Sequence, residues 1–211
     1  IMVESKDFSD PLLDIPVFSL YGKVRRPKPG MMDGFDVLLV DLQDLGCRIY
    51  TFITTLRYVL EAAAQSNKRV VVLDRPNPAG RPVEGLTLRP GWESFVGAGP
   101  LPMRHGLSLG ELALWFVRIL NLDVECEVFT MEGWAPANGP GYGWPLGERT
   151  WVNPSPNAPN LWMARCYSGT VMLEGTTLSE GRGTTRPLEV FGAPDLEPRK
   201  LLAEMQRLAP R

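Results

Sequence analysis

Three short apolar runs stand out in the first part of the chain, at Ile15–Leu20, Val37–Val40 and Val70–Leu73. The second run is followed directly by Asp41 and the third by Asp74. Continuous rather than alternating apolar character is typical of strands that are covered on both faces, as in a parallel sheet. The pattern therefore predicts a parallel, or mostly parallel, sheet with carboxylates at the ends of two strands.

Amphipathic segments lie between and after these runs. Phe52–Ala64 repeats apolar residues at helical spacing, so the second and third runs with this segment form a strand, helix, strand unit. A second helix is predicted over Ser108–Leu120, because Ser108 and Glu111 have the spacing of a capping box. Three further elements are predicted: strands over Val124–Phe129 and Thr170–Leu173, and a helix over Pro198–Leu208.

The alternation of strands and helices predicts an α/β fold whose sheet has helices on both faces. A chain of 211 residues that is 44% hydrophobic can bury a core. The 20 Pro and 21 Gly concentrate in long loops at 75–102, 133–159 and 175–194. We expect one large domain over residues 1–194, and the start of a C-terminal domain or a linker helix over 195–211.

Charge and composition argue against several classes of function. The 22 basic and 24 acidic residues give a net charge of -2, which provides no cationic field for nucleic acid. His105 is the single histidine and the three cysteines have no Cys-x-x-Cys spacing, so no protein-built metal site is expected. No phosphate-binding glycine motif opens a helix, so no nucleotide cofactor is expected either. No apolar stretch is long enough to span a membrane.

The candidate chemistry begins at the two strand ends. In open parallel sheets, ligands bind beyond the carboxyl ends of the strands, where Asp41 and Asp74 are expected. Polar clusters follow each aspartate, over 41–51 and 74–78. The alternative stays open that each aspartate only caps or braces the turn that follows it.

Three later segments add polar side chains. Glu84 lies in a Val-Glu-Gly segment, and His105 lies in Arg-His-Gly just before a predicted helix start, where it could act as a ligand or as a plain hydrogen-bonding residue. Glu174, Glu180 and Arg182 lie in a glycine-rich segment over 173–185, which could also be a turn with solvated charges.

These residue types together favour a carbohydrate site. Sugar rings offer apolar faces to aromatic side chains and hydroxyl groups to carboxylates and amides, and glycosidic cleavage normally requires a pair of acids. Tryptophans at positions 92, 134, 144, 151 and 162 lie in or beside the long loops. The residues alone carry the prediction no further than this.

Several of these motifs resemble those of the NamZ-type exo-β-N-acetylmuramidases. The similarity covers nearly the whole chain in order and spacing. The matching segments are Ser19–Gly22, Asp41–Thr51, Leu73–Pro78, Val83–Gly85, Arg104–Gly106, Asn153–Asn157, Glu174–Thr176 and Ser179–Thr184.

The resemblance implies an enzyme that releases N-acetylmuramic acid from the non-reducing end of peptidoglycan fragments without a cofactor, on a first domain that is Rossmann-like. We expect Asp41, Glu84 and Glu180 to be the catalytic carboxylates. Arg48, Arg75 and Arg182 are the candidates to bind the lactyl carboxylate of the sugar. The other expected substrate-binding residues are Gln43, Tyr50, Asp74, Asn77, His105, Glu174 and Thr184.

Family members carry a Pro-Glu-His-Gly motif upstream of the segment that matches Ile1, so the resemblance also implies that this chain is an interior fragment and could be inactive by itself. The expected partners are muropeptides or saccharides of N-acetylmuramic acid and N-acetylglucosamine, and the expected location of the parent protein is periplasmic or extracellular. The main alternative is a non-catalytic peptidoglycan-binding module, which would bind such a sugar without turnover.

Overall fold

The structure is a computed structural model that describes residues 5–133 and 149–209. The chain forms two compact units, unit 1 over residues 1–150 and unit 2 over residues 151–211, and each is described by itself. The domain boundary expected between residues 194 and 195 stays a prediction. Part of the second long loop, with its tryptophans at positions 134 and 144, lies outside the described residues.

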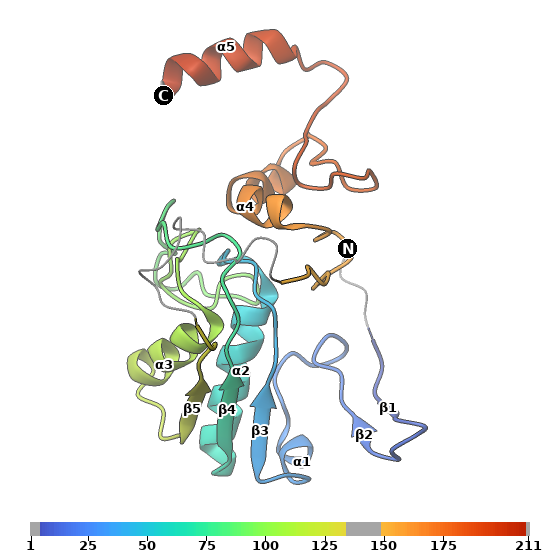
Figure 1. Cartoon of the computed structure of the whole chain (residues 1–211), viewed down its shortest axis with the longest axis vertical. Coiled ribbons are helices and arrows are strands. Elements are labelled where there is room, and N and C mark those ends of the chain that lie inside the picture. Colours follow the sequence, from blue (N-terminus) through green and yellow to red (C-terminus); the bar gives the residue numbers. More distant parts are fainter. Residues whose placement is uncertain (1–4, 134–148, 210–211) are drawn as a thin grey trace. The chain divides into compact units, whose positions relative to one another are not determined.

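The centre of unit 1 is a three-stranded parallel sheet in the order β3-β4-β5 (Figure 1). Its strands are β3 (Val37–Val40), β4 (Arg69–Leu73) and β5 (Cys126–Phe129). Their residues pair in parallel register, with Leu38 opposite Val70 and Val70 opposite Cys126. The three strands predicted over these segments, and their parallel direction, are confirmed.

Two helices connect and flank these strands, as the apolar spacing predicted. Helix α2 (Thr51–Ser66) joins β3 to β4 and ends at Asn67, which takes a left-handed conformation. Helix α3 (Leu109–Ile119) precedes β5. The predicted capping box is confirmed: the Glu111 amide donates to Ser108 Oγ at 3.3 Å, and the Ser108 amide donates to Glu111 Oε2 at 2.8 Å.

The hydrophobic core of unit 1 lies between these helices and one face of the sheet. Alternate strand residues of all three strands point into it, and so do buried residues of α2, of α3 and of the short helix α1 (Pro29–Met32). Its fully buried members include Ile53, Leu60, Val70 and Phe116. Burial of side chains of this size typically contributes about 1.5–3 kcal/mol each, so this core accounts for much of the stability of unit 1.

The opposite face of the sheet is partly exposed. Val37, Leu39 and Phe129 lie on it, with 42%, 62% and 57% of their surface exposed. The described helices of unit 1 all contribute to the core on the other face. The prediction of helices on both faces is therefore wrong for the described part of unit 1.

The run Ile15–Leu20 does not join the parallel sheet. Pro16–Val17 (β2) pairs antiparallel with Phe8–Ser9 (β1) in a separate two-stranded ribbon. Ile15 and Phe18 remain 50% and 42% exposed. The run was therefore wrongly predicted to be a strand covered on both faces; a proline at its second position and a short pairing partner confine it to this ribbon.

Unit 2 is helical where it is regular. Helix α4 (Leu161–Thr170) continues into the 3-10 helix η1 (Val171–Gly175), and α5 (Pro198–Leu208) lies near the C-terminal end. The helix predicted over Pro198–Leu208 is confirmed. No helix among the described residues has the length and apolarity needed to cross a membrane.

The strand predicted over Thr170–Leu173 is wrong. Met163, Tyr167 and Val171 are buried and recur at helical spacing, so this segment extends the buried face that α4 begins. Asn160 starts that helix, because its side chain accepts a hydrogen bond from the Met163 amide at 2.9 Å.

Candidate functional site

The carboxyl ends of β3 and β4 bring two polar clusters of unit 1 together. Arg75 donates to a single oxygen of Asp41, Oδ1, with Nε at 2.7 Å and Nη2 at 2.6 Å. Gln43 Nε2 donates to the carbonyl oxygens of Asp44 at 2.9 Å and Pro76 at 3.1 Å, so its amide also joins the two segments. The side chains of Asp41 and Arg75 are 50% and 31% exposed, which leaves this ion pair accessible.

Asp74 has a different role in the structure. Its carboxylate accepts hydrogen bonds from Ser108 Oγ at 2.7 Å, from the Gly110 amide at 2.8 Å and from the Arg75 amide at 3.0 Å. A carboxylate at this position satisfies one free amide of the first turn of α3, that of Gly110, and interacts favourably with the helix dipole. The structure thus joins Asp74 to a helix start, which is the bracing role that the sequence left open.

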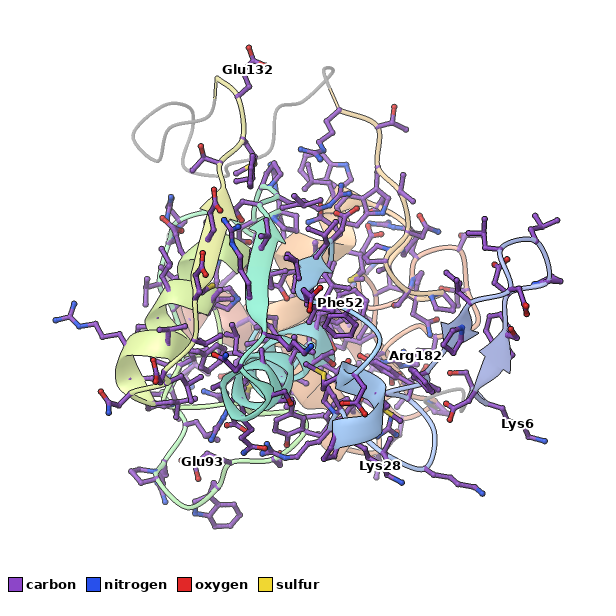
Figure 2. The ribbon with its side chains drawn as sticks, turned by 90° about the horizontal axis from the view of Figure 1, so that it is seen from below. Lys6, Lys28, Phe52, Glu93, Glu132 and Arg182 are labelled. Carbon is purple, nitrogen blue, oxygen red and sulfur yellow. The ribbon has the colours of Figure 1, made fainter. Side chains whose placement is uncertain are left out.

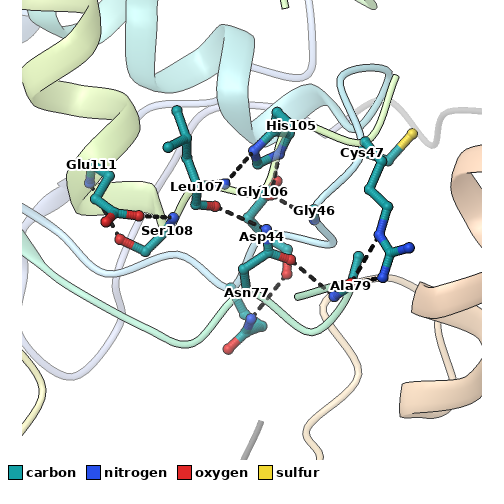
Figure 3. A network of polar contacts seen from close by, with 12 residues as sticks. Asp44, Gly46, Cys47, Asn77, Ala79, His105, Gly106, Leu107, Ser108 and Glu111 are labelled. Carbon is teal, nitrogen blue, oxygen red and sulfur yellow. Dashed lines mark hydrogen bonds and ion pairs between the residues drawn. The ribbon is translucent and has the colours of Figure 1, made fainter. Parts of the chain in front are cut away.

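A buried pair links the 41–51 cluster to the segment before α3. His105 Nε2 lies 3.2 Å from Asp44 Oδ2, and the side chains are 0% and 4% exposed (Figure 3). The Leu107 amide donates to His105 Nδ1 at 3.1 Å, so Nδ1 is an acceptor and a neutral ring carries its proton on Nε2. The same Asp44 oxygen accepts from the Gly46 amide at 2.7 Å. His105 therefore links these loops from inside unit 1. Its expected role in substrate binding stays a prediction.

Asn77 completes this buried network. Its Oδ1 accepts from the amides of Ala79 at 2.9 Å and Gly80 at 3.2 Å, and its Nδ2 donates to the carbonyl oxygen of Leu107 at 2.9 Å (Figure 3). Gly46 has a φ of +75° and lies against the Asn77 side chain so closely that a Cβ would collide with it. The glycine is therefore required both by its conformation and by this close approach.

Glu84 is presented at the surface by a mostly buried arginine. Arg104 Nη1 donates to Glu84 Oε2 at 2.7 Å, and the two side chains are 10% and 63% exposed. Arg104 Nε donates to the carbonyl oxygen of Ala79 at 2.9 Å. Among the candidate catalytic residues of unit 1, Glu84 and Asp41 are thus both solvent-accessible and both bound by a guanidinium.

Arg48 and Tyr50, two predicted substrate-binding residues, are 8% exposed. Arg48 Nη1 donates to the carbonyl oxygens of Leu86 at 2.7 Å and Leu101 at 2.6 Å, and burial lowers its pKa. Tyr50 precedes the first residue of α2, and its ring packs at 4.7 Å from that of Phe52. Arg48 therefore ties the 86–101 loop to the rest of unit 1.

That loop also projects an aromatic side chain. Figure 2 shows Glu93 on a segment that extends away from the body of unit 1. The neighbouring Trp92 is 71% exposed. An exposed indole on a loop is suited to stacking on a sugar face.

The predicted residues of unit 2 form a cluster of their own. Arg182 is held by two carboxylates: its Nε lies 2.6 Å from Glu180 Oε1, and its Nη2 donates to Glu174 Oε1. Burial lowers the pKa of Arg182, but the two carboxylates outweigh it and the net shift is upward. Thr184 donates to the Gly181 carbonyl oxygen at 2.6 Å and stabilises the turn beside them.

The sequence reasoning missed three charged residues that organise unit 1. Asp44 binds the single histidine, Arg104 binds Glu84, and Arg81 donates to both carboxylate oxygens of Glu111 at 2.8 and 3.0 Å. Each stands within or beside a segment already singled out, which was the available signal. Their partners lie 20 to 61 positions away, a separation at which sequence spacing gives no guide to contact.

Glu111 shows how strongly these contacts act on a titrating group. Burial raises its pKa, but the hydrogen bonds from Arg81 and Ser108 outweigh burial, so the pKa lies below its ordinary value of 4.5. Within the described ranges, no three His, Cys, Asp or Glu side chains are grouped so that they could hold a metal ion.

The fold and the site define a mixed α/β protein with arginine-bound carboxylates near the carboxyl edge of a parallel sheet. Residues 2–162 match the family model described as exo-beta-N-acetylmuramidase NamZ, N-terminal, and residues 165–210 match its C-terminal counterpart. The chain therefore belongs to the exo-beta-N-acetylmuramidase NamZ family, as its motifs indicated.

Comparison with individual proteins gives the same family. The chain is 40% identical over 199 residues to the peptidoglycan beta-N-acetylmuramidase NamZ of Bacillus subtilis strain 168, covering 94% of this chain and 47% of that protein. Two DUF1343 family crystal structures from Bacteroides fragilis NCTC 9343 are similar, with TM-scores of 0.82 and 0.78 and identities of 38% and 34%. They cover 95% and 90% of this chain but 52% and 51% of their own. The chain thus spans about half the length of the relatives it matches.

Proposed function

We propose that the full-length protein is an exo-β-N-acetylmuramidase, which releases N-acetylmuramic acid from the non-reducing end of peptidoglycan fragments. The observation that supports this most directly is the match to both NamZ family models, together with 40% identity to a protein named for that activity. We propose muropeptides and related saccharides as substrates and, because peptidoglycan lies outside the cytoplasmic membrane, a periplasmic or extracellular location. We also propose that unit 1 is Rossmann-like; the parallel β3-α2-β4 connection supports this finer description.

In unit 1 we propose Asp41 and Glu84 as the carboxylates that act on the substrate. Both are exposed enough to touch a sugar, and each has a carboxylate oxygen that accepts no hydrogen bond from the described residues: Oδ2 of Asp41 and Oε1 of Glu84. Most glycosidases use a pair of carboxylates, whether the reaction retains or inverts configuration. Glu180 of unit 2 stays a further candidate.

The lactyl group of N-acetylmuramic acid needs a cationic partner, and Arg75 fits that requirement best within unit 1. Its guanidinium is 31% exposed and binds one carboxylate already, whereas Arg48 is buried and bound to two carbonyl oxygens. A guanidinium can accommodate a second carboxylate through its remaining donors. Arg182 of unit 2, which is 33% exposed, stays a candidate for the same role.

A chromogenic β-N-acetylmuramic acid glycoside tests the function directly. We expect the full-length protein to hydrolyse it, and both Asp41→Asn and Glu84→Gln to lower kcat by at least about 10²-fold, the usual contribution of acid–base groups. Saturable binding without turnover would instead indicate a binding module. Arg75→Ala should weaken use of the muramic acid glycoside more than that of an N-acetylglucosamine glycoside, and unchanged preference would refute the lactyl role.

A further inference from the structure

We infer that Arg104 is a positioning residue: it holds the Glu84 carboxylate in the orientation in which Glu84 acts. This inference rests on the proposed function, because it gives Glu84 a substrate to act on. Its basis is the arrangement of one mostly buried guanidinium between a buried carbonyl oxygen and an exposed carboxylate.

The inner end of the Arg104 guanidinium is fixed by the backbone. Nε and Nη2 both donate to the carbonyl oxygen of Ala79, which belongs to the turn that the Asn77 side chain closes. That turn has almost no exposed surface, since Asn77 is 5% and Ala79 is 0% exposed. A planar guanidinium that is held at two nitrogens has little freedom to rotate.

The outer end of the same group reaches the proposed site. Arg104 Nη1 donates to Glu84 Oε2 at 2.7 Å, a short charge-assisted hydrogen bond. Within the described part of the chain, the other oxygen of Glu84 accepts no hydrogen bond, and the side chain is 63% exposed. One oxygen is therefore anchored and the other is left for a substrate or a water molecule.

The backbones of Glu84 and Arg104 are also paired with each other. The Glu84 amide donates to the Arg104 carbonyl oxygen at 3.1 Å and the Arg104 amide to the Glu84 carbonyl oxygen at 2.9 Å. Gly85 then turns the chain with a φ of +80°, and a Cβ there would lie 2.8 Å from Met103 Cβ. The sequence Glu-Gly therefore lets the chain lie against the segment that carries Arg104.

A purely structural role is the competing explanation, because Arg104 also braces the Ala79 turn. The two roles differ in what they predict for catalysis. If Arg104 acts through Glu84, its replacement lowers kcat while KM changes little. The same replacement then has no effect on kcat in a protein whose residue 84 has already been changed. If Arg104 only braces the turn, its replacement lowers the melting temperature, and any loss of activity is the same whatever residue stands at position 84.

The experiment measures kcat, KM and melting temperature for the full-length protein on the chromogenic β-N-acetylmuramic acid glycoside. Arg104→Lys keeps the charge but cannot bind Ala79 and Glu84 together through a planar fork. We expect its kcat to fall on the order of 10²-fold, the effect of misplacing a catalytic group by about 1 Å, with KM within about threefold of wild type. Arg69→Lys, at the start of β4, is the matched control, and its kcat should stay within about twofold of wild type.

A double-mutant cycle isolates the contact. In a Glu84→Gln background, or in Glu84→Asp if activity is otherwise too low, Arg104→Lys should change kcat by less than about twofold. Glu84→Asp by itself shortens the side chain away from Arg104 without altering the Ala79 turn. If Arg104→Lys does not fold, Glu84→Asp still allows the positioning role to be overturned, because that role requires its kcat to fall with KM little changed.

The outcomes separate the two proposals. A wild-type kcat in the folded Arg104→Lys protein, or a loss that persists in full in the Glu84 background, overturns the positioning role alone. If Arg104→Lys does not fold, an unchanged kcat in Glu84→Asp overturns it. Absence of turnover by the wild-type protein refutes the proposed function and, with it, this inference.

Discussion

Asp74 offers a sharp test of whether a carboxylate at a strand end braces the fold or contacts a ligand. Replacing Asp74 by Ala removes the acceptor of the Ser108 hydroxyl and of the Gly110 amide, which lie 2.7 and 2.8 Å from its oxygens. Hydrogen bonds to a charged group contribute about 1.5–3 kcal/mol each, and a carboxylate at a helix N-terminus adds about 0.3–1 kcal/mol. Because the site is only partly buried and Ser108 can turn to water, the low end applies, and we expect a loss of about 3 kcal/mol.

The assay is urea unfolding followed by far-ultraviolet circular dichroism, with the midpoint and slope fitted separately. Asp74→Asn keeps one acceptor oxygen but loses the charge, so it should lose about half as much stability. Asp123→Ala, at an exposed carboxylate beyond the end of α3, is the control and should change stability by less than about 0.5 kcal/mol. An Asp74→Ala protein with wild-type stability but impaired glycoside hydrolysis would refute the bracing role and restore Asp74 as a substrate-binding residue.

Three further predictions concern residues of unit 1, and one of them also involves Cys166 of unit 2. Gly110→Ala should destabilise by about 1–3 kcal/mol in urea unfolding although alanine favours helices, because its Cβ would lie 2.5 Å from Val128; a more stable variant would contradict the packing argument. Cys47 is fully buried and burial raises its pKa to about 12, so a thiol reagent should label exposed Cys166 first and Cys47 only on unfolding, as mass spectrometry can show. Glu111 has a lowered pKa, so its contribution to stability is present above pH 4.5 and is lost as the pH falls through the pKa of the folded state. In Glu111→Gln the melting temperature should therefore fall less steeply below pH 4.5 than in the wild type. An equally steep fall in both proteins would contradict this.

Local signals predicted much of unit 1. The apolar runs and the capping box gave the strands β3 and β4 and the start of α3 closely, because each depends on residues near one another in the chain. The apolar run at Ile15–Leu20 failed because burial depends on what pairs with a segment, and β2 meets only a two-residue strand. Thr170–Leu173 failed because a short apolar run is compatible with either helix or strand, and the buried face of α4 decides between them.

The candidate site could be predicted in outline but not in its contacts. The segments at Asp41 and Asp74 do meet near the carboxyl edge of the sheet, as expected from parallel strands. Which carboxylate is exposed and which one braces a helix depends on tertiary partners such as Ser108 and Arg75, and sequence position does not specify them. The expected roles of Asp41, Asp74 and Arg182 at the substrate stay predictions.

The exposed sheet face has a practical consequence for handling this chain in isolation. Val37 and Leu39 present an apolar strip along β3, a strand that has a hydrogen-bonded neighbour on one side only among the described residues. Apolar strand edges of this kind recruit other chains, either through backbone pairing or through simple adhesion. Preparations of these 211 residues are therefore expected to form aggregates as the protein concentration rises. Lysine substitutions at positions 37 and 39 should prevent this aggregation, as light scattering can measure.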